Sequence, residues 1–229
     1  MIIRHMQKTV LALALVGTSM SALAAFDLAV IGSINPTACT PTLGGGGTID
    51  YGTILSSSLS ATAYTALPQK SIAISISCDA PAKVGLIGNS GRPGTTAGVT
   101  ESAYGQGRSP ITLNGISGPA VVGLGLHGTD MIGGYAQWID SIVLDGVNSV
   151  TMSKTVTGTT WRDATWGNLF DQNYSRVLTF GASPATGPVA FEEMVGRVLV
   201  QAYINKADDL DLTTPVVLDG LTVIDLVYL

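Results

Sequence analysis

Alternation of apolar and polar residues with a period of two recurs along this chain and predicts β-strands. The clearest case is residues 71–78, where serine and alanine occupy one face and the apolar face consists of Ile72, Ile74, Ile76 and Cys78. A strand with one buried face produces this pattern because successive side chains point to opposite sides. Residues 26–34 alternate in the same way and predict a strand near the N-terminus.

Other strands are predicted where β-branched and apolar residues cluster between turn residues. They fall at residues 83–87, 121–126, 136–144, 149–156, 194–204 and 221–229, with a short edge segment at residues 51–55. The glycine run at residues 44–47, the glycine pair at 133–134 and the Asp-Gly pair at 145–146 predict turns, and residues 205–211 predict a charged turn. Residues 89–120 are rich in Gly, Ser and Thr and predict a long decorated connection, while residues 161–188 are read as irregular.

No segment combines an apolar face with the Glu, Lys and Arg face of a surface helix. The pattern therefore predicts an all-β fold, an antiparallel β-sandwich or barrel.

The first 24 residues predict a secretory signal peptide. Arg4 and Lys8 precede an apolar run at residues 10–16, and Ala22-Leu23-Ala24 fits a cleavage site. A membrane anchor is the alternative, but the apolar run falls short of the ~20 residues that span a bilayer. We expect export to the periplasm and one mature domain at residues 25–229.

Composition narrows the possible partners. Charged residues make up 12% of the chain and the formal net charge is −5. An acidic chain without a basic run argues against nucleic acid as a partner. No motif in the sequence indicates a cofactor.

The chain contains two cysteines, Cys39 and Cys78. In an oxidising compartment a disulfide between them is the default expectation, with two free thiols as the alternative. The Cα atoms of a disulfide usually lie roughly 4.4–6.8 Å apart.

Three places resemble the pilins of chaperone/usher fimbriae. The segment 28–34 leading into Cys39 is similar to a donor strand, the second cysteine ends a strand and is followed by Asp79, and the C-terminus alternates up to a penultimate aromatic residue. Among known relatives the chain looks closest to an uncharacterised family of secreted proteobacterial proteins often encoded beside fimbrial chaperone and usher genes.

The resemblance implies an immunoglobulin-like (pilin-like) sandwich and a non-enzymatic structural or adhesive subunit of a surface fimbria, assembled by donor-strand exchange. It implies neighbouring subunits, a periplasmic chaperone and an outer-membrane usher as partners. Within residues 25–38, the donor-strand face would comprise Phe26, Leu28, Val30, Gly32 and Ile34. The strand that the chaperone recognises would present Ile224, Leu226 and Tyr228. The alternative is a self-complemented periplasmic or surface protein that binds carbohydrate.

Catalytic and metal-binding chemistry finds little support. His127, the one histidine after the predicted signal peptide, has no Gly-x-Ser-x-Gly elbow beside which it could act as a base. One histidine with two paired cysteines cannot complete a zinc site. Three aspartates between residues 208 and 211 lack the calcium-loop spacing and predict a solvated turn. The tryptophans could form a sugar-stacking platform for a surface glycan, but core or loop packing is the preferred interpretation for Trp138, Trp161 and Trp166.

Overall fold

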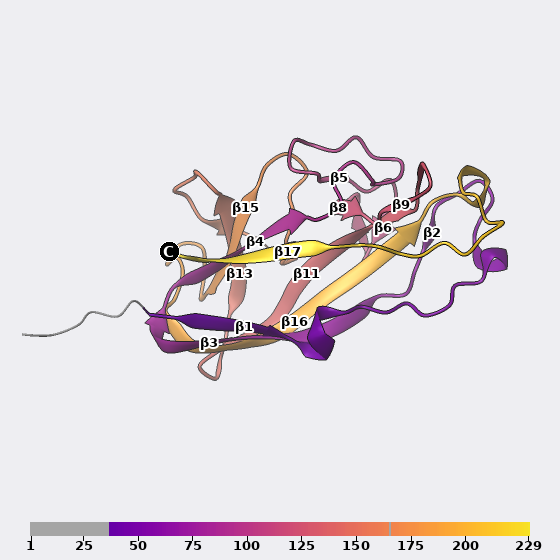
Figure 1. Ribbon diagram of the computed structural model, residues 1–229. Helices are drawn as coiled ribbons and strands as arrows, with labels where there is room; N and C mark the ends of the chain where they lie inside the picture. The colour runs from indigo at the N-terminus through magenta and orange to yellow at the C-terminus, as the bar shows by residue number, and fades with distance from the viewer. Residues whose placement is uncertain (1–36, 165) are drawn as a thin grey trace, which may run out of the picture. The chain divides into compact units, whose positions relative to one another are not determined.

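The computed structural model describes residues 37–164 and 166–229, which form two antiparallel β-sheets that share one apolar core (Figure 1). Strand order in the first sheet is β1 (Cys39–Leu43), β3 (Lys70–Ala82), β16 (Phe191–Ile204), β11 (Gly133–Leu144), β8 (Ala120–Gly123) and β5 (Gly107–Arg108). Two short strands flank this order, β2 (Thr65–Ala66) beside β16 and β12 (Val147–Asn148) beside β11.

Strand order in the second sheet is β14 (Arg162–Asp163), β13 (Val150–Thr155), β15 (Arg176–Gly181), β4 (Val84–Ser90) and β17 (Thr222–Tyr228). Two small hairpins pair β6 (Thr112–Leu113) with β7 (Ile116–Ser117) and β9 (Leu126–His127) with β10 (Asp130–Met131). Short 3-10 turns occur at η1 (Gly44–Gly47), η2 (Ser56–Ser58) and η3 (Ala207–Asp209). The predicted all-β sandwich is confirmed. Among the described residues, no helix is long and apolar enough to cross a membrane.

The core lies between the two sheets and follows the predicted alternation. On β3, Ile74, Ile76 and Cys78 are buried while Ser71 and Ser77 are exposed. Leu86 of β4 and Phe180 of β15 meet this face from the second sheet. Each such fully buried side chain contributes about 1.5–3 kcal/mol, so strand alternation explains much of the stability of the fold.

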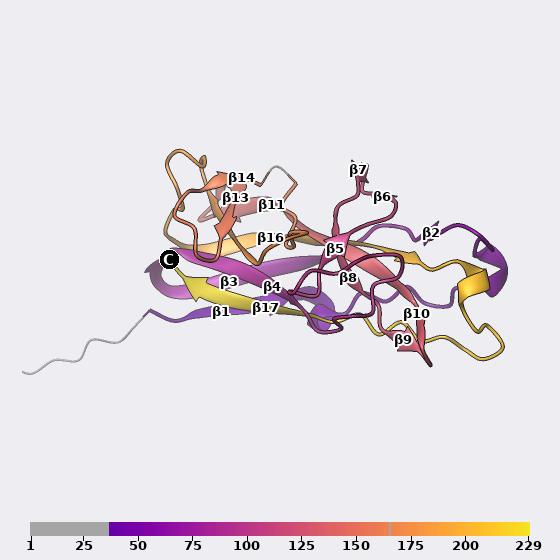
Figure 2. The same ribbon diagram turned by 90° about the horizontal axis from the view of Figure 1, so that it is seen from above.

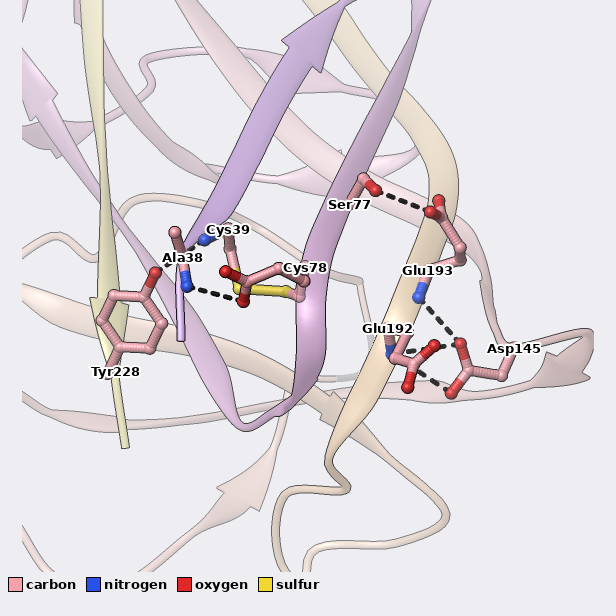
Figure 3. Close-up of a disulfide and its surroundings, with 9 residues drawn as sticks. Ala38, Cys39, Ser77, Cys78, Asp145, Glu192, Glu193 and Tyr228 are labelled. Atoms are coloured by element: carbon pink, nitrogen blue, oxygen red, sulfur yellow. Dashed lines mark hydrogen bonds between the residues drawn. A yellow bond between two sulfur atoms is a disulfide. The ribbon is translucent and has the colours of Figure 1, made fainter. Parts of the chain in front are cut away.

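The predicted disulfide between Cys39 and Cys78 is present and joins β1 to β3 (Figure 3). The two cysteines are directly opposite each other in the ladder, and the neighbouring pair, Ala38 and Asp79, is hydrogen-bonded. Cys39 and Cys78 therefore form a non-hydrogen-bonded pair, in which Cα atoms approach closely. Their Cα separation of 4.0 Å is shorter than we expected from disulfides in general.

The long connection predicted at residues 89–120 forms a second, smaller core on the outer face of the first sheet. Leu113 and Ala97 of this insertion pack against Trp138 of β11 and Tyr203 of β16. The Tyr203 hydroxyl donates to the Ala97 carbonyl at 2.7 Å. The insertion is thus a structural layer with its own apolar contacts.

Three sequence expectations were wrong. Residues 51–55 form no strand, and the glycines at 133–134 lie within β11, where the backbone of Tyr203 leaves no room for a side chain. Residues 161–188 contain the central strand β15, whose residues 177–181 are all buried. Because β15 is covered on both faces, its sequence does not alternate, and the signal on which we relied is missing.

Candidate functional site: an open sheet edge beside an apolar groove

The last strand of the chain, β17, occupies an edge of the second sheet. It pairs with β4 along its whole length, from Thr222 opposite Ser90 to Tyr228 opposite Val84. No other strand of the described chain pairs with its outer side. In Figures 1 and 2, β17 runs beside β1, the edge strand of the first sheet.

Two hydrogen bonds show which main-chain groups of β17 face the open side. The Gly91 N–H donates to the Leu221 carbonyl and the Leu229 N–H donates to the Lys83 carbonyl. Odd-numbered residues therefore bond to β4, because antiparallel ladders alternate between bonded and non-bonded pairs. The N–H and C=O groups of Ile224 and Leu226 point to the open edge, where the described residues provide no partner. Such a row of groups is a template for another strand.

The inner face of β17 is apolar. Ile224 and Leu226 are half-buried and pack against the main core, whereas Val223 is exposed on the other face. A groove with a volume of about 1240 Å³ lies beside the first half of β17, where Thr222 and Ile224 line it. Its floor comes mainly from alternate residues of β16, namely Val198, Val200, Ala202 and Ile204. We call this cavity the edge groove.

Two extended segments form the walls of the edge groove, residues 48–55 after β1 and residues 210–221 before β17. Neither segment belongs to a β-ladder. Their apolar side chains lean onto the core; the half-buried ones include Ile49, Ile54, Leu212, Val216 and Leu218. The edge groove is thus bordered by segments that lie outside the β-ladders.

Side chains hold the first wall in place. The Lys70 ammonium donates to the Asp50 carbonyl at 2.7 Å. The Tyr51 hydroxyl accepts from the Ala202 N–H at 3.2 Å and lies 3.4 Å from the Val200 carbonyl. Burial raises the pKa of Tyr51, although the bond from Ala202 opposes this, so the hydroxyl stays neutral at physiological pH.

The second wall is held by an ion pair and by the backbone. Arg92 binds both carboxylate oxygens of Asp219, at 2.7 and 2.8 Å, and this contact lowers the pKa of Asp219. The Asp219 N–H donates to the Leu124 carbonyl at 2.9 Å. Next to this wall, Tyr135 of β11 shares a 2.8 Å hydrogen bond with Thr222, and burial raises the pKa of Tyr135 to about 12.

The space between β1 and β17 is closed at its other end by Tyr228 (Figure 3). The Cys39 N–H donates to the Tyr228 hydroxyl at 2.8 Å, which links the first strand to the last. The Ala38 N–H donates to the Asp79 carboxylate at 2.9 Å beside the disulfide. Tyr228 therefore links β17 to β1 beyond the part of β17 that lines the edge groove.

The structure places the other sequence candidates as follows. The predicted donor-strand residues Phe26, Leu28, Val30, Gly32 and Ile34, and the predicted signal peptide, lie outside the described residues. His127 lies on β9 with Nε2 3.1 Å from the Thr214 hydroxyl. Within residues 37–164 and 166–229, no three potential metal-ligating side chains converge.

The tryptophans do not converge on one surface. Trp138 is fully buried in the second core, Trp161 lies under the Lys154 ammonium, and Trp166 is 61% exposed. Core or loop packing, as expected, describes the first two. Trp166 requires a separate explanation.

Sequence reasoning found β17 but missed the walls of the edge groove. Residues 210–221 nevertheless carry a signal, because Leu210, Leu212, Val216 and Leu218 continue the even-numbered apolar face of β17. The proline and the short polar residues between them concealed this alternation. As a physical object, the site can accept an extended segment that pairs with β17 and places every second side chain over the core.

The described residues therefore define an antiparallel β-sandwich with one disulfide and a long edge strand, β17, beside an apolar groove. The family described as "Protein of unknown function (DUF1120)" matches residues 28–130. The chain is 27% identical to Protein GltF of Escherichia coli (strain K12) over an alignment of 235 residues. This alignment covers 89% of this chain and 88% of that protein. It is 30% identical to Uncharacterized protein YhcF of the same organism over 213 residues, 86% of this chain and 87% of that protein. The protein belongs to the same family as YhcF. No solved structure matches it.

Proposed function

We propose that this protein is a non-enzymatic structural or adhesive subunit of a surface fimbria and assembles by donor-strand exchange. The observation that carries the proposal is the open edge of β17 beside the edge groove. Unpaired backbone next to an apolar groove is costly in water, and an added strand removes both costs. Pilin donor-strand complementation is a known case of this recognition mode.

The occupant that we propose is the segment 26–34 of a neighbouring copy. Its nine residues would extend about 30 Å at ~3.3 Å per residue, enough to cover the seven residues of β17. Phe26, Leu28, Val30 and Ile34 would lie on the side that meets the core, with Gly32 among them. That alternation matches the spacing of Ile224 and Leu226 along the edge.

A neighbouring copy fits this arrangement better than the chain's own segment. Ala38 and Cys39 are fixed beside the end of β17 by Asp79 and Tyr228. The chain's own strand would have to reverse direction within residues 35–37 to lie beside β17. Donation to the next copy instead makes a head-to-tail contact that does not close on itself, and such contacts build fibres.

The same edge explains the need for a periplasmic chaperone and an outer-membrane usher. Before assembly, an exposed edge strand with apolar neighbours invites aggregation. A chaperone strand that covers Ile224, Leu226 and Tyr228 would protect the subunit after its export and until its neighbour replaces the chaperone at the cell surface. The rival function, a self-complemented monomer, needs no such protection.

The test compares two charged substitutions in the segment 26–34. Val30→Asp places a carboxylate on the face that enters the groove, where burial without a partner costs several kcal/mol. Ile31→Asp is the matched control, because it introduces the same charge on the opposite face. Each protein is co-expressed with its chaperone, and polymers are measured by light scattering and electron microscopy. We expect polymers from wild type and from Ile31→Asp, and none from Val30→Asp.

Two results would contradict the proposal. Polymers of normal length from Val30→Asp would show that this face does not enter a groove. A wild-type protein that is monomeric and equally soluble with and without the chaperone would favour the self-complemented rival.

A further inference from the structure

A second cavity lies on the outer face of the first sheet, away from the edge groove. Its volume is about 730 Å³. The floor comes from Asp140 of β11 and Arg197 of β16, and the rim from Trp166, Asp163 and Asn114. We call it the outer pocket. Figure 2 shows the strands that border it, with β13 and β14 beside β11.

Trp166 is held at the rim by backbone contacts of the residues that follow it. The Ile139 N–H donates to the Gly167 carbonyl at 2.8 Å, and the Leu169 N–H donates to the Gln137 carbonyl at 3.0 Å. Gly167 has a φ of +61°, and its Cα lies so close to the Ile139 carbonyl that no side chain fits. The loop therefore adds to a free stretch of β11 and fixes the backbone that carries the exposed indole.

A fixed, exposed tryptophan beside a polar cavity is a recognition feature. An indole supplies a large, rigid contact surface at low entropic cost. Nothing in the described residues covers most of the Trp166 ring, which is 61% exposed, whereas Trp138 is fully buried. The ring has the flat apolar surface on which the C–H face of a pyranose packs.

The floor of the outer pocket carries a planar polar pair. Arg197 Nε and Nη2 donate to the two carboxylate oxygens of Asp140 at 3.0 and 2.9 Å. The pair is in register on adjacent strands, and both side chains remain substantially exposed. Arg197 Nη1 can still donate to an acceptor, and the remaining lone pairs of Asp140 can still accept from a donor, as adjacent sugar hydroxyls require.

Backbone geometry positions the other polar groups. A β-bulge lies between Asp140 and Val143, and Ser141 within it has a φ of 54°. Bulges of this kind redirect side chains next to functional sites. On the opposite rim, the Asn114 N–H donates to Gln201 Oε1 at 2.6 Å, which fixes the β6–β7 hairpin and its Asn114 side chain at the cavity.

The charges of the lining favour an uncharged ligand. Lys70 lines the cavity, but its ammonium donates to the Asp50 carbonyl and lies over the Tyr51 ring. The remaining charged groups of the lining are Arg197, Asp140 and Asp163. The two positive and two negative groups of the lining cancel in net charge, so the cavity has no excess positive charge to attract an anionic ligand such as a sialylated or phosphorylated sugar.

We propose that the outer pocket binds a neutral saccharide, with the pyranose ring stacked on Trp166 and its hydroxyls bound by Arg197 and Asp140. The pocket lies on the first sheet and the open edge belongs to the second, so strand addition and sugar binding do not compete for the same residues. The inference does not depend on fibre assembly. In a fibre, every subunit would present one such pocket.

The test uses the processed wild-type protein on an array of neutral and sialylated glycans, followed by fluorescence titration and saturation-transfer NMR with the neutral glycans that bind. We expect saturable binding of at least one neutral glycan. Trp166→Ala and Arg197→Ala should each lower the affinity about tenfold or more, which corresponds to about 1.4 kcal/mol. Trp161→Ala is the matched control and should bind as wild type does.

Trp166 is exposed, so its removal should leave the fold intact, and circular dichroism with intact disulfide checks this. Absence of binding to every neutral glycan would overturn the proposal. Equal affinity of Trp166→Ala and wild type, or binding of sialylated glycans alone, would overturn it as well.

Discussion

The two edges of the second sheet differ in length and in chemistry. At one edge, β14 has two residues, Arg162 and Asp163, both charged and exposed. At the other, β17 has seven residues, and the single charged one is Asp225. Natural sheets protect their edges with short strands and charges, and β14 follows this rule while β17 departs from it.

The difference shows that this sequence is able to protect an edge and does so on one side. Next to β14, Trp161 is covered by the Lys154 ammonium, 4.9 Å from the ring centre. Next to β17, the edge groove is lined by apolar side chains, and Val217 and Leu55 at its walls are largely exposed. A long, weakly charged edge is absent at β14 and present at β17, and the proposed addition of a strand to β17 would account for this difference.

Removal of the disulfide should have the largest effect on stability. Cys39 and Cys78 are 39 residues apart, and a loop of this length predicts a loss of about 4 kcal/mol in the free energy of unfolding. The double variant Cys39→Ala, Cys78→Ala should show this loss in urea unfolding. Because the bond holds β1 beside the open edge, amide exchange should accelerate more in β1 than in β13.

A loss below about 1 kcal/mol would mean that β1 is held by its ladder with β3 alone. Equal acceleration of exchange in β1 and β13 would mean that the disulfide stabilises the whole sandwich and has no special role at the β17 side.

Proline substitutions in β17 should distinguish the N–H groups that bond to β4 from those on the open edge. The Leu226 N–H points to the open edge, so Leu226→Pro removes no bond to β4, whereas Asp225→Pro removes one. Leu226→Ala controls for the lost side chain. We expect the free energies of unfolding of Leu226→Pro and Leu226→Ala to differ by less than about 1 kcal/mol, roughly the net contribution of one hydrogen bond. Asp225→Pro should lower the free energy of unfolding by more than this.

Assembly should distinguish the two Leu226 variants, although their stabilities are expected to be similar. Leu226→Pro should block strand addition because it removes an N–H that the donor needs, while Leu226→Ala should still assemble. If Leu226→Pro assembled as Leu226→Ala does, the added strand would not pair with this edge.

Loss of the charges at β14 should have the smallest effect. The double variant Arg162→Val, Asp163→Val makes this edge apolar and should raise the rate of aggregation on mild heating, measured by light scattering. Lys83→Val, Asp208→Val is the matched control, since it removes one exposed basic and one exposed acidic residue from positions outside strands. Equal aggregation of the two variants would mean that β14 needs no protection.

Sequence alone determined the parts of this protein that depend on local patterns. The period of two predicted β3 and β17, apolar clusters between turn residues predicted β11 and β16, and two cysteines in a chain expected to be exported predicted their bond. These inferences succeed because a strand with one buried face records its environment in its own residues. A strand that is buried on both faces, such as β15, has no alternation from which it could be predicted.

Only the tertiary structure shows which residues form the edge groove and the outer pocket. The edge groove joins residues 48–55, β16 and residues 210–224, and the outer pocket joins Asp140, Trp166 and Arg197, which are far apart along the chain. Nor does the sequence of β17 show that one of its two sides has no partner among the described strands. Strand order is set by how distant segments share one core, so the identity of an edge strand appears only when the sheets are assembled.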